Sequence, residues 1–491
     1  MATLLNERIG NMDTNYEFTT SDYIDSRFLL PRPDNQDNTE KVLEAIGFIV
    51  QRKKDGSVKY GFCANKFAIY LSKCIRAVQD HQGHLYIYNL KGFYQEAEDW
   101  IIGKIVKSLM NQVLQLWSLG HEQAAMDAYK RDIRKIVTCF NQDDLINLSN
   151  GILDIETLEL HPHSPDYYCT VQLPMQYGPN EKCPRFEQFI CEITGGDMEL
   201  GKVIQEMVGY CLCHNVKADK AFFLYGNGKN GKSVLAKMIE ALVGAENVSN
   251  VKLSQLNDNF GLSSLVNKNV NISAENELLG KFDTGNFKAI ISEDTVNVTR
   301  KYKDDLSTRL NCKMIMLLNT LPSTTDVTYG YFRKILIIPF TQTFDENEDK
   351  FPVEKLLREL PGILNWALEG LKRLQANDYL FSSCAAIQSL MEHYQNQQNP
   401  TGVFFEESYT QCDGGRVKKS DIYSDYQNWS NDNGLDAVNR QTFWNMLKIQ
   451  AGKADSTIRL EYKRVHGVDY LDGYKRKYVR PAPNSDYDIS F

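Results

Sequence analysis

One short glycine-rich segment constrains this chain more than any other. Residues 226–233 read GNGKNGKS and fit the pattern G-x-x-x-x-G-K-[ST] at every fixed position. A short apolar run at 222–225 precedes it, as in a buried parallel strand, and apolar residues recur at helical spacing from 234 to 242 before Gly244. Strand, glycine loop and helix in this order predict a phosphate-binding loop in an α/β fold.

The loop predicts a nucleotide site whose ligands are ATP and Mg²⁺. Lys232 is expected to reach the β- and γ-phosphates, and Ser233 to ligate Mg²⁺. The alternative is a turn rich in glycine and asparagine before an ordinary helix. In the rest of the loop, the backbone N–H groups would surround the phosphates. These groups belong to Gly226, Asn227, Gly228, Lys229, Asn230 and Gly231.

A carboxylate is also needed to place the metal and the attacking water. Residues 268–277, KNVNISAENE, alternate like a strand and end in two acids. A carboxylate at the carboxyl end of a strand lies on the edge where α/β folds bind ligands. Glu275 is therefore the predicted metal and water carboxylate, with Glu277 as the alternative acid; two solvated acids in a loop remain a second interpretation.

Two later apolar segments complete the candidate ATPase. Residues 313–322, KMIMLLNTLP, predict a strand ending at Asn319, whose amide would hold the attacking water or the γ-phosphate. Residues 331–340, YFRKILIIPF, predict another strand. Arg333 before it is a candidate arginine finger for a neighbouring subunit's nucleotide. Alternatively, Arg333 and Lys334 cap the strand.

Nucleic-acid contacts must come from local basic patches, because the 491-residue chain has a formal net charge of −8. The first patch lies in residues 293–305, EDTVNVTRKYKDD. Arg300, Lys301 and Lys303 would neutralise phosphates, and Tyr302 would stack on a base. The alternative is an exposed edge hairpin whose charges discourage aggregation.

The second patch lies near the carboxyl end. Two helices are predicted at 417–434 and 439–450, followed by a two-stranded ribbon over 458–480 with turns near Gly467 and Gly473. This is the winged-helix order, in which the second helix enters a major groove; a winged helix that contacts only protein is the alternative. The candidate DNA contacts are Arg440, Gln441, Lys448, Arg459, Lys463 and Arg464.

Taken in order, these motifs resemble the superfamily 3 helicases, in the branch found in phage, plasmid and poxvirus primase-helicases. The resemblance covers about residues 85–345 and includes INLSNGILDIETLELHPHSPDYYCTVQLPMQYG and the helical stretch at 186–213. It implies an AAA+-like ATPase that forms a hexameric ring, moves 3′ to 5′ on single-stranded DNA and projects the basic hairpin into a central channel. Residues matching the family's Walker motifs, sensor and finger are Lys232, Ser233, Glu275, Asn319 and Arg333.

Two positions depart from the family pattern. Residues 291–294 read Ile-Ser-Glu-Asp where a glycine-rich turn is common, which leaves the turn geometry of the hairpin open. Glu275 follows Ala274, so a single acid ends the strand and the roles of Glu275 and Glu277 stay open.

The expected fold is an α/β AAA+-like P-loop ATPase core with a preceding helical collar domain and a C-terminal winged-helix domain. We assign residues 1–135 to an N-terminal region of unclear role, 136–215 to the collar and 216–345 to the ATPase core. Residues 346–400 form a helical subdomain, with a helix break near Pro361 and a linker at 396–402, and 401–491 form the winged helix.

The predicted function is that of an ATP-dependent DNA helicase or replication initiator of a phage or mobile element, acting in the host cytoplasm without a membrane segment. Expected partners are single-stranded and forked DNA, a replication origin, further copies of the chain, and a separate primase or other replication protein. The alternatives are a bifunctional primase-helicase and an ATP-switched DNA-binding regulator. Residues 1–85 show no Asp-x-Asp/Glu pair with a following histidine, so primer synthesis is not predicted.

Overall fold

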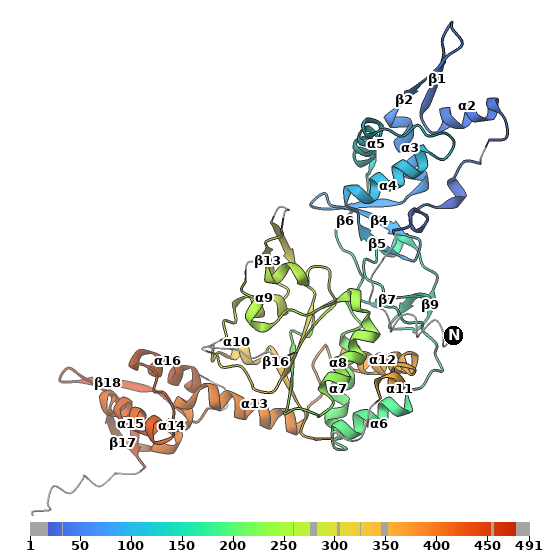
Figure 1. Cartoon of the computed structure of the whole chain (residues 1–491). Helices are drawn as coiled ribbons and strands as arrows, with labels where there is room; N and C mark the ends of the chain where they lie inside the picture. Colours follow the sequence, from blue (N-terminus) through green and yellow to red (C-terminus); the bar gives the residue numbers. More distant parts are fainter. Residues whose placement is uncertain are drawn as a thin grey trace, which may run out of the picture.

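The computed structural model describes residues 18–31, 33–258, 260–274, 282–301, 305–324, 326–344, 352–452 and 456–477. Three domains follow one another along an elongated molecule, with the N-terminal and C-terminal domains at opposite ends of the central one (Figure 1). No helix among the described residues combines the length and apolarity needed to cross a membrane.

The central domain is built on five parallel strands in the order β11-β12-β15-β10-β16. The strand predicted at 222–225 is confirmed, and the strand predicted from 313 to Asn319 ends one residue earlier, at Leu318. The strand predicted at 331–340 starts later, because Tyr331 and Phe332 belong to a short helix, α10 (Tyr329–Phe332), that buries both rings. The strand bounds are β10 Ala221–Tyr225, β11 Val248–Ser249, β12 Val270–Ser273, β15 Lys313–Leu318 and β16 Ile335–Pro339.

Successive side chains of β10 enter two different hydrophobic clusters. Phe222 and Leu224 pack with α7 (Met198–Tyr210), α8 (Lys232–Val243) and α12 (Leu360–Ala376). Ala221 and Phe223 pack on the other face with α9 (Gly285–Ile291) and with α13 (Ala385–Gln398) through Tyr394. Because helices cover both faces, the strands are apolar at nearly every position, as expected for a buried parallel sheet.

The range predicted as a helical collar is helical only in its second half. Strands β7 (Leu145–Leu148), β8 (Gly151–Asp154) and β9 (Leu160–His161) form a small antiparallel sheet before α6 (Pro184–Ile193) and α7. The prediction was wrong there because it overlooked short strands of four residues or fewer.

The helical subdomain packs directly on the collar helices. A Cβ at Gly209 of α7 would lie 2.3 Å from the carbonyl oxygen of Ala367 in α12, so only glycine allows this approach. The predicted helix break is confirmed, since α11 (Val353–Leu357) ends before α12 and Pro361 lies in the first turn of α12.

Residues 396–402 do not form the predicted linker. They end α13 and begin α14 (Pro400–Ser408), with Asn399 between the two helices. Asn399 is 5% exposed and Thr401 is fully buried. The polar composition indicated a loop, but Pro400 occupies a first-turn position where its missing N–H costs nothing, and tertiary packing buries its neighbours.

The C-terminal domain contains both predicted helices, α15 (Lys419–Asp432) and α16 (Arg440–Ala451). The ribbon is part of a three-stranded sheet of order β17-β19-β18, with bounds β17 Tyr409–Lys418, β18 Glu461–Val465 and β19 Val468–Arg476. Gly467 lies in the predicted turn, but Gly473 lies inside β19. Gly473 lies where the pairing between β17 and β19 shifts register, and its φ is +82°. The glycine therefore allows the backbone conformation of a β-bulge and does not form a turn.

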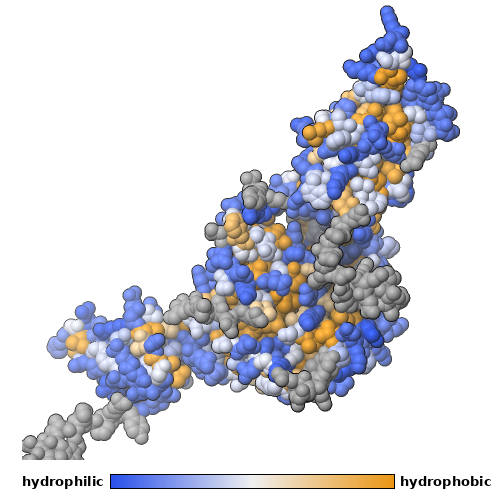
Figure 2. All heavy atoms as spheres, viewed as in Figure 1, coloured by the Kyte–Doolittle hydropathy of each residue, from blue (hydrophilic) through white to orange (hydrophobic). Residues whose placement is uncertain are grey.

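The N-terminal domain, for which the sequence predicted no elements, has a mixed fold. Helices α3 (Ala64–Cys74), α4 (Asp99–Met110) and α5 (Leu119–Asp132) share one core cluster with the hairpin of β1 (Phe48–Arg52) and β2 (Val58–Phe62). Hydrophilic side chains cover the protruding end of this hairpin (Figure 2). A four-stranded sheet of order β5-β4-β3-β6 faces the central domain, with bounds β3 Ala77–Asp80, β4 Leu85–Asn89, β5 Phe93–Glu96 and β6 Ile136–Val137.

Candidate nucleotide and nucleic-acid sites

The glycine loop joins β10 to α8 at the carboxyl end of the parallel sheet. A Cβ at Gly226 would lie 2.3 Å from the carbonyl oxygen of Phe340. At Gly231, where φ is +89°, it would lie 2.6 Å from Cγ2 of Ile193. The two fixed glycines of the pattern are therefore required by this backbone, whereas the space around Gly228 is open for a ligand.

Lys232 is the most informative residue of the loop. It is 6% exposed, and its Nζ donates to the carbonyl oxygen of Gly226 and, at 3.4 Å, to that of Asn227. Burial lowers the pKa of Lys232. These partners are neutral, and a buried cation is costly without an anion. The arrangement fits a bound triphosphate, which would supply that negative charge.

Asn319 lies next to Lys232 in the structure. The Nζ of Lys232 is 3.4 Å from Oδ1 of Asn319, because β15 pairs directly with β10 and both strands end at the same edge of the sheet. Ser233, in the first turn of α8, is exposed at this edge and offers a hydroxyl to a metal. β12 leads toward Glu275 and Glu277, which lie outside the described residues.

Arg333 lies far from this edge. It precedes β16, whose Ile335 pairs with Ala221 at the opposite end of β10 from the glycine loop. A strand rises by ~3.3 Å per residue, so the length of β10 alone separates Arg333 from the glycine loop by roughly 15 Å. Arg333 Nη1 is 3.3 Å from Oδ2 of Asp219, and Lys334 Nζ is 3.6 Å from the same oxygen. This geometry matches both the strand-cap interpretation and a finger directed at another subunit.

The basic segment is an antiparallel hairpin of β13 (Thr295–Val298) and β14 (Leu306–Arg309), as the resemblance implied. Arg300 is half-buried and Lys301 is exposed near the tip. Tyr302 and Lys303, the other two predicted contacts, lie outside the described residues.

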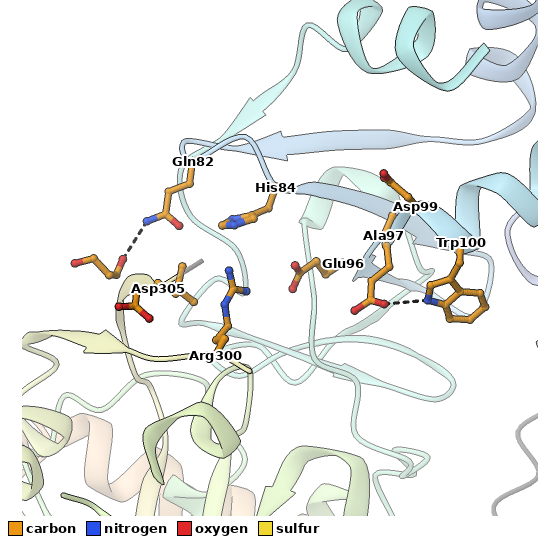
Figure 3. A pocket seen from close by; sticks show the side chains of 11 residues that line it. Gln82, His84, Glu96, Ala97, Asp99, Trp100, Arg300 and Asp305 are labelled. Carbon is orange, nitrogen blue, oxygen red and sulfur yellow. Dashed lines mark hydrogen bonds between the residues drawn. The ribbon is translucent and has the colours of Figure 1, made fainter. Parts of the chain in front are cut away.

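Within one chain, the hairpin faces the N-terminal domain. Nε2 of Gln82 donates to the carbonyl oxygen of Ser307 at 3.0 Å, and a cavity of about 780 Å³ lies between the two domains. Figure 3 shows Arg300 reaching from the hairpin toward His84, which directly precedes β4, and Glu96 at the end of β5. The N-terminal domain contributes Glu96, Glu98 and Asp99 to the lining, so the wall opposite Arg300 carries three acidic residues.

The candidate contacts of the C-terminal domain divide into two groups. Gln441 and Lys448 are exposed on the same face of α16, and Arg440 begins that helix. Tyr462 of β18 packs against Trp444 of α16. Because side chains alternate along a strand, Arg464 shares the face of Tyr462, whereas Lys463 lies on the other face. Arg459 is exposed just before β18.

Two further residues belong to this patch and were missed. The Nζ of Lys419 lies 4.5 Å from the ring centres of both Trp444 and Tyr462. Burial lowers the pKa of Lys419, and the nearby positive charges of Lys448 and Arg440 act in the same direction. Asn445 is exposed between Gln441 and Lys448 on α16, at the helical spacing that would have identified it.

Comparisons with known proteins bear on the family. Residues 67–195 match the family described as D5 N terminal like, and residues 224–333 match a family of unknown function, DUF5906. Putative helicase L207/L206 of Acanthamoeba polyphaga mimivirus is 22% identical over 343 residues, which are 66% of this chain and 34% of that protein. Putative helicase 121R of Invertebrate iridescent virus 3 is 22% identical over 372 residues, 64% of this chain and 38% of that protein. The chain thus spans about a third of the length of these two relatives.

Two other matches have a short aligned length or a low sequence identity. The uncharacterized mitochondrial protein ymf21 of Marchantia polymorpha is 28% identical over 131 residues, 24% of this chain and 73% of that protein. The apo A form of the NrS-1 C-terminal region is 11% identical with a TM-score of 0.49, covering 82% of this chain and 97% of that chain.

Fold and motif together define an α/β protein with a phosphate-loop sequence at the carboxyl end of a parallel sheet. The D5-type segment and the similarity to the two viral putative helicases support the resemblance to phage and viral primase-helicases. The D5-type match begins at residue 67, inside the N-terminal region to which the sequence assigned no role.

Proposed function

We propose that this protein is a replication helicase of a phage or other mobile element, which hydrolyses ATP and unwinds duplex DNA. The observation that carries the proposal is the buried Lys232, surrounded by neutral oxygens beside Asn319 at the carboxyl edge of the sheet. ATP would be bound through residues 226–232, and Ser233 with Glu275 or Glu277 would hold Mg²⁺. The metal would neutralise charge that develops on the transferred phosphoryl group.

The proposed working form is a ring, a hexamer that moves 3′ to 5′. The position of Arg333 supports it, because a guanidinium at the opposite end of the sheet cannot reach the phosphates of its own loop. In a ring, it would contact the nucleotide of the next subunit as an arginine finger.

The domains have separate proposed roles. Residues 216–345 would form an AAA+-like core, preceded by the collar at 136–215 and followed by the helical subdomain at 346–400. Helices α7 and α12 pack on one face of its sheet, and α13 contacts the other face through Tyr394. Residues 401–491 would form a winged helix that binds duplex DNA, including an origin, through α16.

A strand-displacement assay tests the central claim. Purified full-length protein is mixed with forked DNA, ATP and Mg²⁺, and release of the labelled strand is followed. Release that requires hydrolysable ATP supports the helicase. ATP-dependent DNA binding without strand release would instead favour the ATP-switched regulator.

Replacement of Arg300, Lys301 and Lys303 by alanine should leave basal ATP turnover unchanged and remove its stimulation by single-stranded DNA. The reason is that these cations would neutralise the phosphates of the bound strand. Lys301 is exposed near the tip of the hairpin, where it is accessible to that strand. Arg309→Ala is the matched control, because Arg309 is exposed at the base of the same hairpin, opposite Thr295. Full stimulation of the triple variant would contradict a DNA-binding role.

The double substitution of Arg440 and Lys448 by alanine should weaken duplex DNA binding and reduce its dependence on salt. Each lost phosphate contact lowers the slope of log K against log salt by about 0.9, so a change of about 2 is expected. The measurement is the dissociation constant for a labelled DNA duplex, followed by fluorescence anisotropy at salt concentrations from about 50 to about 200 mM. Arg416→Ala is the control, because its Nε already lies 2.6 Å from Oδ1 of Asp472. An unchanged slope would assign the domain to protein contacts.

A further inference from the structure

A second cavity, of about 380 Å³, lies in the N-terminal domain at the amino ends of the parallel strands β3 and β6. Its walls are the junction of α3 with β3, the segment that joins α5 to β6, and the short turn η3 (Pro165–Tyr167) with the residue that follows it. None of its lining residues belongs to the glycine loop or to the basic hairpin. The volume lies within the range of about 300–1,000 Å³ that is usual for small-molecule sites.

Three cations line this cavity without an anionic partner in the described part of the chain. Arg76 directly precedes β3, and Arg134 and Lys135 directly precede β6. All three are exposed, and none forms an ion pair with a described carboxylate. The N–H of Gln79 donates to the carbonyl oxygen of Lys135 at 3.0 Å, so strand pairing brings the two basic segments together. Because like charges repel one another, an anion bound among these cations would be stabilised.

A stacked pair of tyrosine rings forms another part of the lining. The ring centres of Tyr94 and Tyr168 are 6.0 Å apart, and the Nζ of Lys135 lies 5.3 Å from the centre of the Tyr168 ring. Tyr94 is buried, whereas Tyr168 is partly exposed and so offers its ring to a ligand. The N–H of Tyr94 donates to the carbonyl oxygen of Cys169 at 2.6 Å, which holds this wall in place. An aromatic ring beside cations suits a nucleotide, because the ring stacks on the base and the cations bind the phosphate.

Two carboxylates indicate the same kind of ligand. Asp132 and Asp166 line the cavity, and both are exposed. A site for a simple inorganic anion would gain nothing from these negative charges. A nucleotide, in contrast, carries donor groups on its sugar and on most bases, and a carboxylate accepts hydrogen bonds from such donors. The lining therefore fits a nucleotide better than it fits free phosphate.

We propose that this cavity binds one nucleotide unit, with its phosphate against Arg76 and Arg134 and its base stacked on Tyr168. The planar guanidinium of arginine matches two phosphate oxygens at once, which makes it the better of the two basic side chains for this task. The unit belongs to a free nucleotide or to a strand of nucleic acid, since both present the same phosphate and base. The site is separate from the glycine loop, so the proposal does not depend on ATP hydrolysis.

A pair of double substitutions tests the site in full-length protein that also carries Lys232→Ala, which disables the glycine loop. Arg76→Ala with Arg134→Ala removes both guanidinium groups from the cavity. Lys73→Ala with Arg131→Ala is the matched control, because these exposed cations lie three residues earlier, on α3 and α5, and outside the lining. The probes are adenosine 5′-monophosphate, ribose 5-phosphate and a 5′-phosphorylated thymidine tetranucleotide. Equilibrium dialysis measures the dissociation constant of each.

We expect the cavity double variant to raise the Kd for adenosine monophosphate by about tenfold or more, since each guanidinium would donate charge-assisted hydrogen bonds to the phosphate. The control double variant should leave this Kd unchanged. Tyr168→Leu should weaken binding of adenosine monophosphate and spare ribose 5-phosphate, which has no base to stack.

The probes also distinguish the two sources of the nucleotide. Tighter binding of the tetranucleotide than of adenosine monophosphate would identify a nucleic-acid strand as the ligand, and the reverse order would identify a free nucleotide. Equal affinities of the two double variants, or no binding of any probe, would overturn the site. The proposed function would be unaffected, because strand displacement by the wild-type protein is measured separately.

Discussion

Replacement of Lys232 by alanine is expected to lower ATP turnover by about 10²–10³-fold, the usual cost of removing one preorganised group that stabilises developing charge. The ammonium is buried against carbonyl oxygens of its own loop and lies 3.4 Å from the Asn319 amide oxygen. Phosphate release at saturating ATP measures the effect.

Lys237→Ala is the matched control for this substitution. Lys237 lies on the same helix, α8, but is exposed and away from the loop. Its removal changes the net charge equally and should leave turnover within about twofold, because exposed substitutions away from such features usually change stability by less than ~0.5 kcal/mol. Equal activity of the two variants would remove the basis for a nucleotide site at Lys232.

Arg333→Ala should lower ATP turnover by about 10³-fold or more if the guanidinium acts as a finger, since such fingers contribute 10³–10⁵ in kcat. Because the finger and the phosphate loop that it serves would belong to different subunits, mixing Arg333→Ala with Lys232→Ala protein should restore part of the activity. Each mixed ring would contain some interfaces with an intact lysine and an intact arginine. Turnover of the two variants, separately and mixed, is the measurement.

Asp219→Asn separates this role from strand capping. Asp219 is the ion-pair partner of both Arg333 and Lys334, so its replacement removes the capping contact and keeps the guanidinium. If Arg333 only caps β16, Asp219→Asn should reduce activity as much as Arg333→Ala does. A finger role predicts that Asp219→Asn stays active, and absence of recovery in the mixed sample would count against it.

Features set by short-range rules could be predicted from the sequence. The glycine loop, the start of α8 and the break before Pro361 each depend on a few adjacent residues with restricted backbone conformations. The strand that ends before Asn319 was predictable because its apolar run is continuous and bounded by a turn. The two C-terminal helices followed from their spacing and from Gly434 between them.

Features set by distant packing could not be predicted in the same way. Asn399 and Thr401 are polar, yet α14 and the domain contact bury them in what the composition indicated was a linker. Gly473 was predicted to make a turn, but its place in β19 depends on the pairing with β17, a strand about 60 positions earlier. The N-terminal sheet also joins short strands whose individual patterns are too weak to identify.

The sequence alone predicted the chemical groups of the candidate site. These are a phosphate loop with a lysine and a hydroxyl group, a side-chain amide after a later strand, and clusters of cations. Which of these groups meet was settled in three dimensions. Parallel pairing brings Lys232 and Asn319 together across 87 positions of chain, and the same sheet carries Arg333 to its opposite end. The physical reason is that loop geometry depends on steric limits between neighbouring residues, whereas strand order depends on burying both faces of the sheet at once.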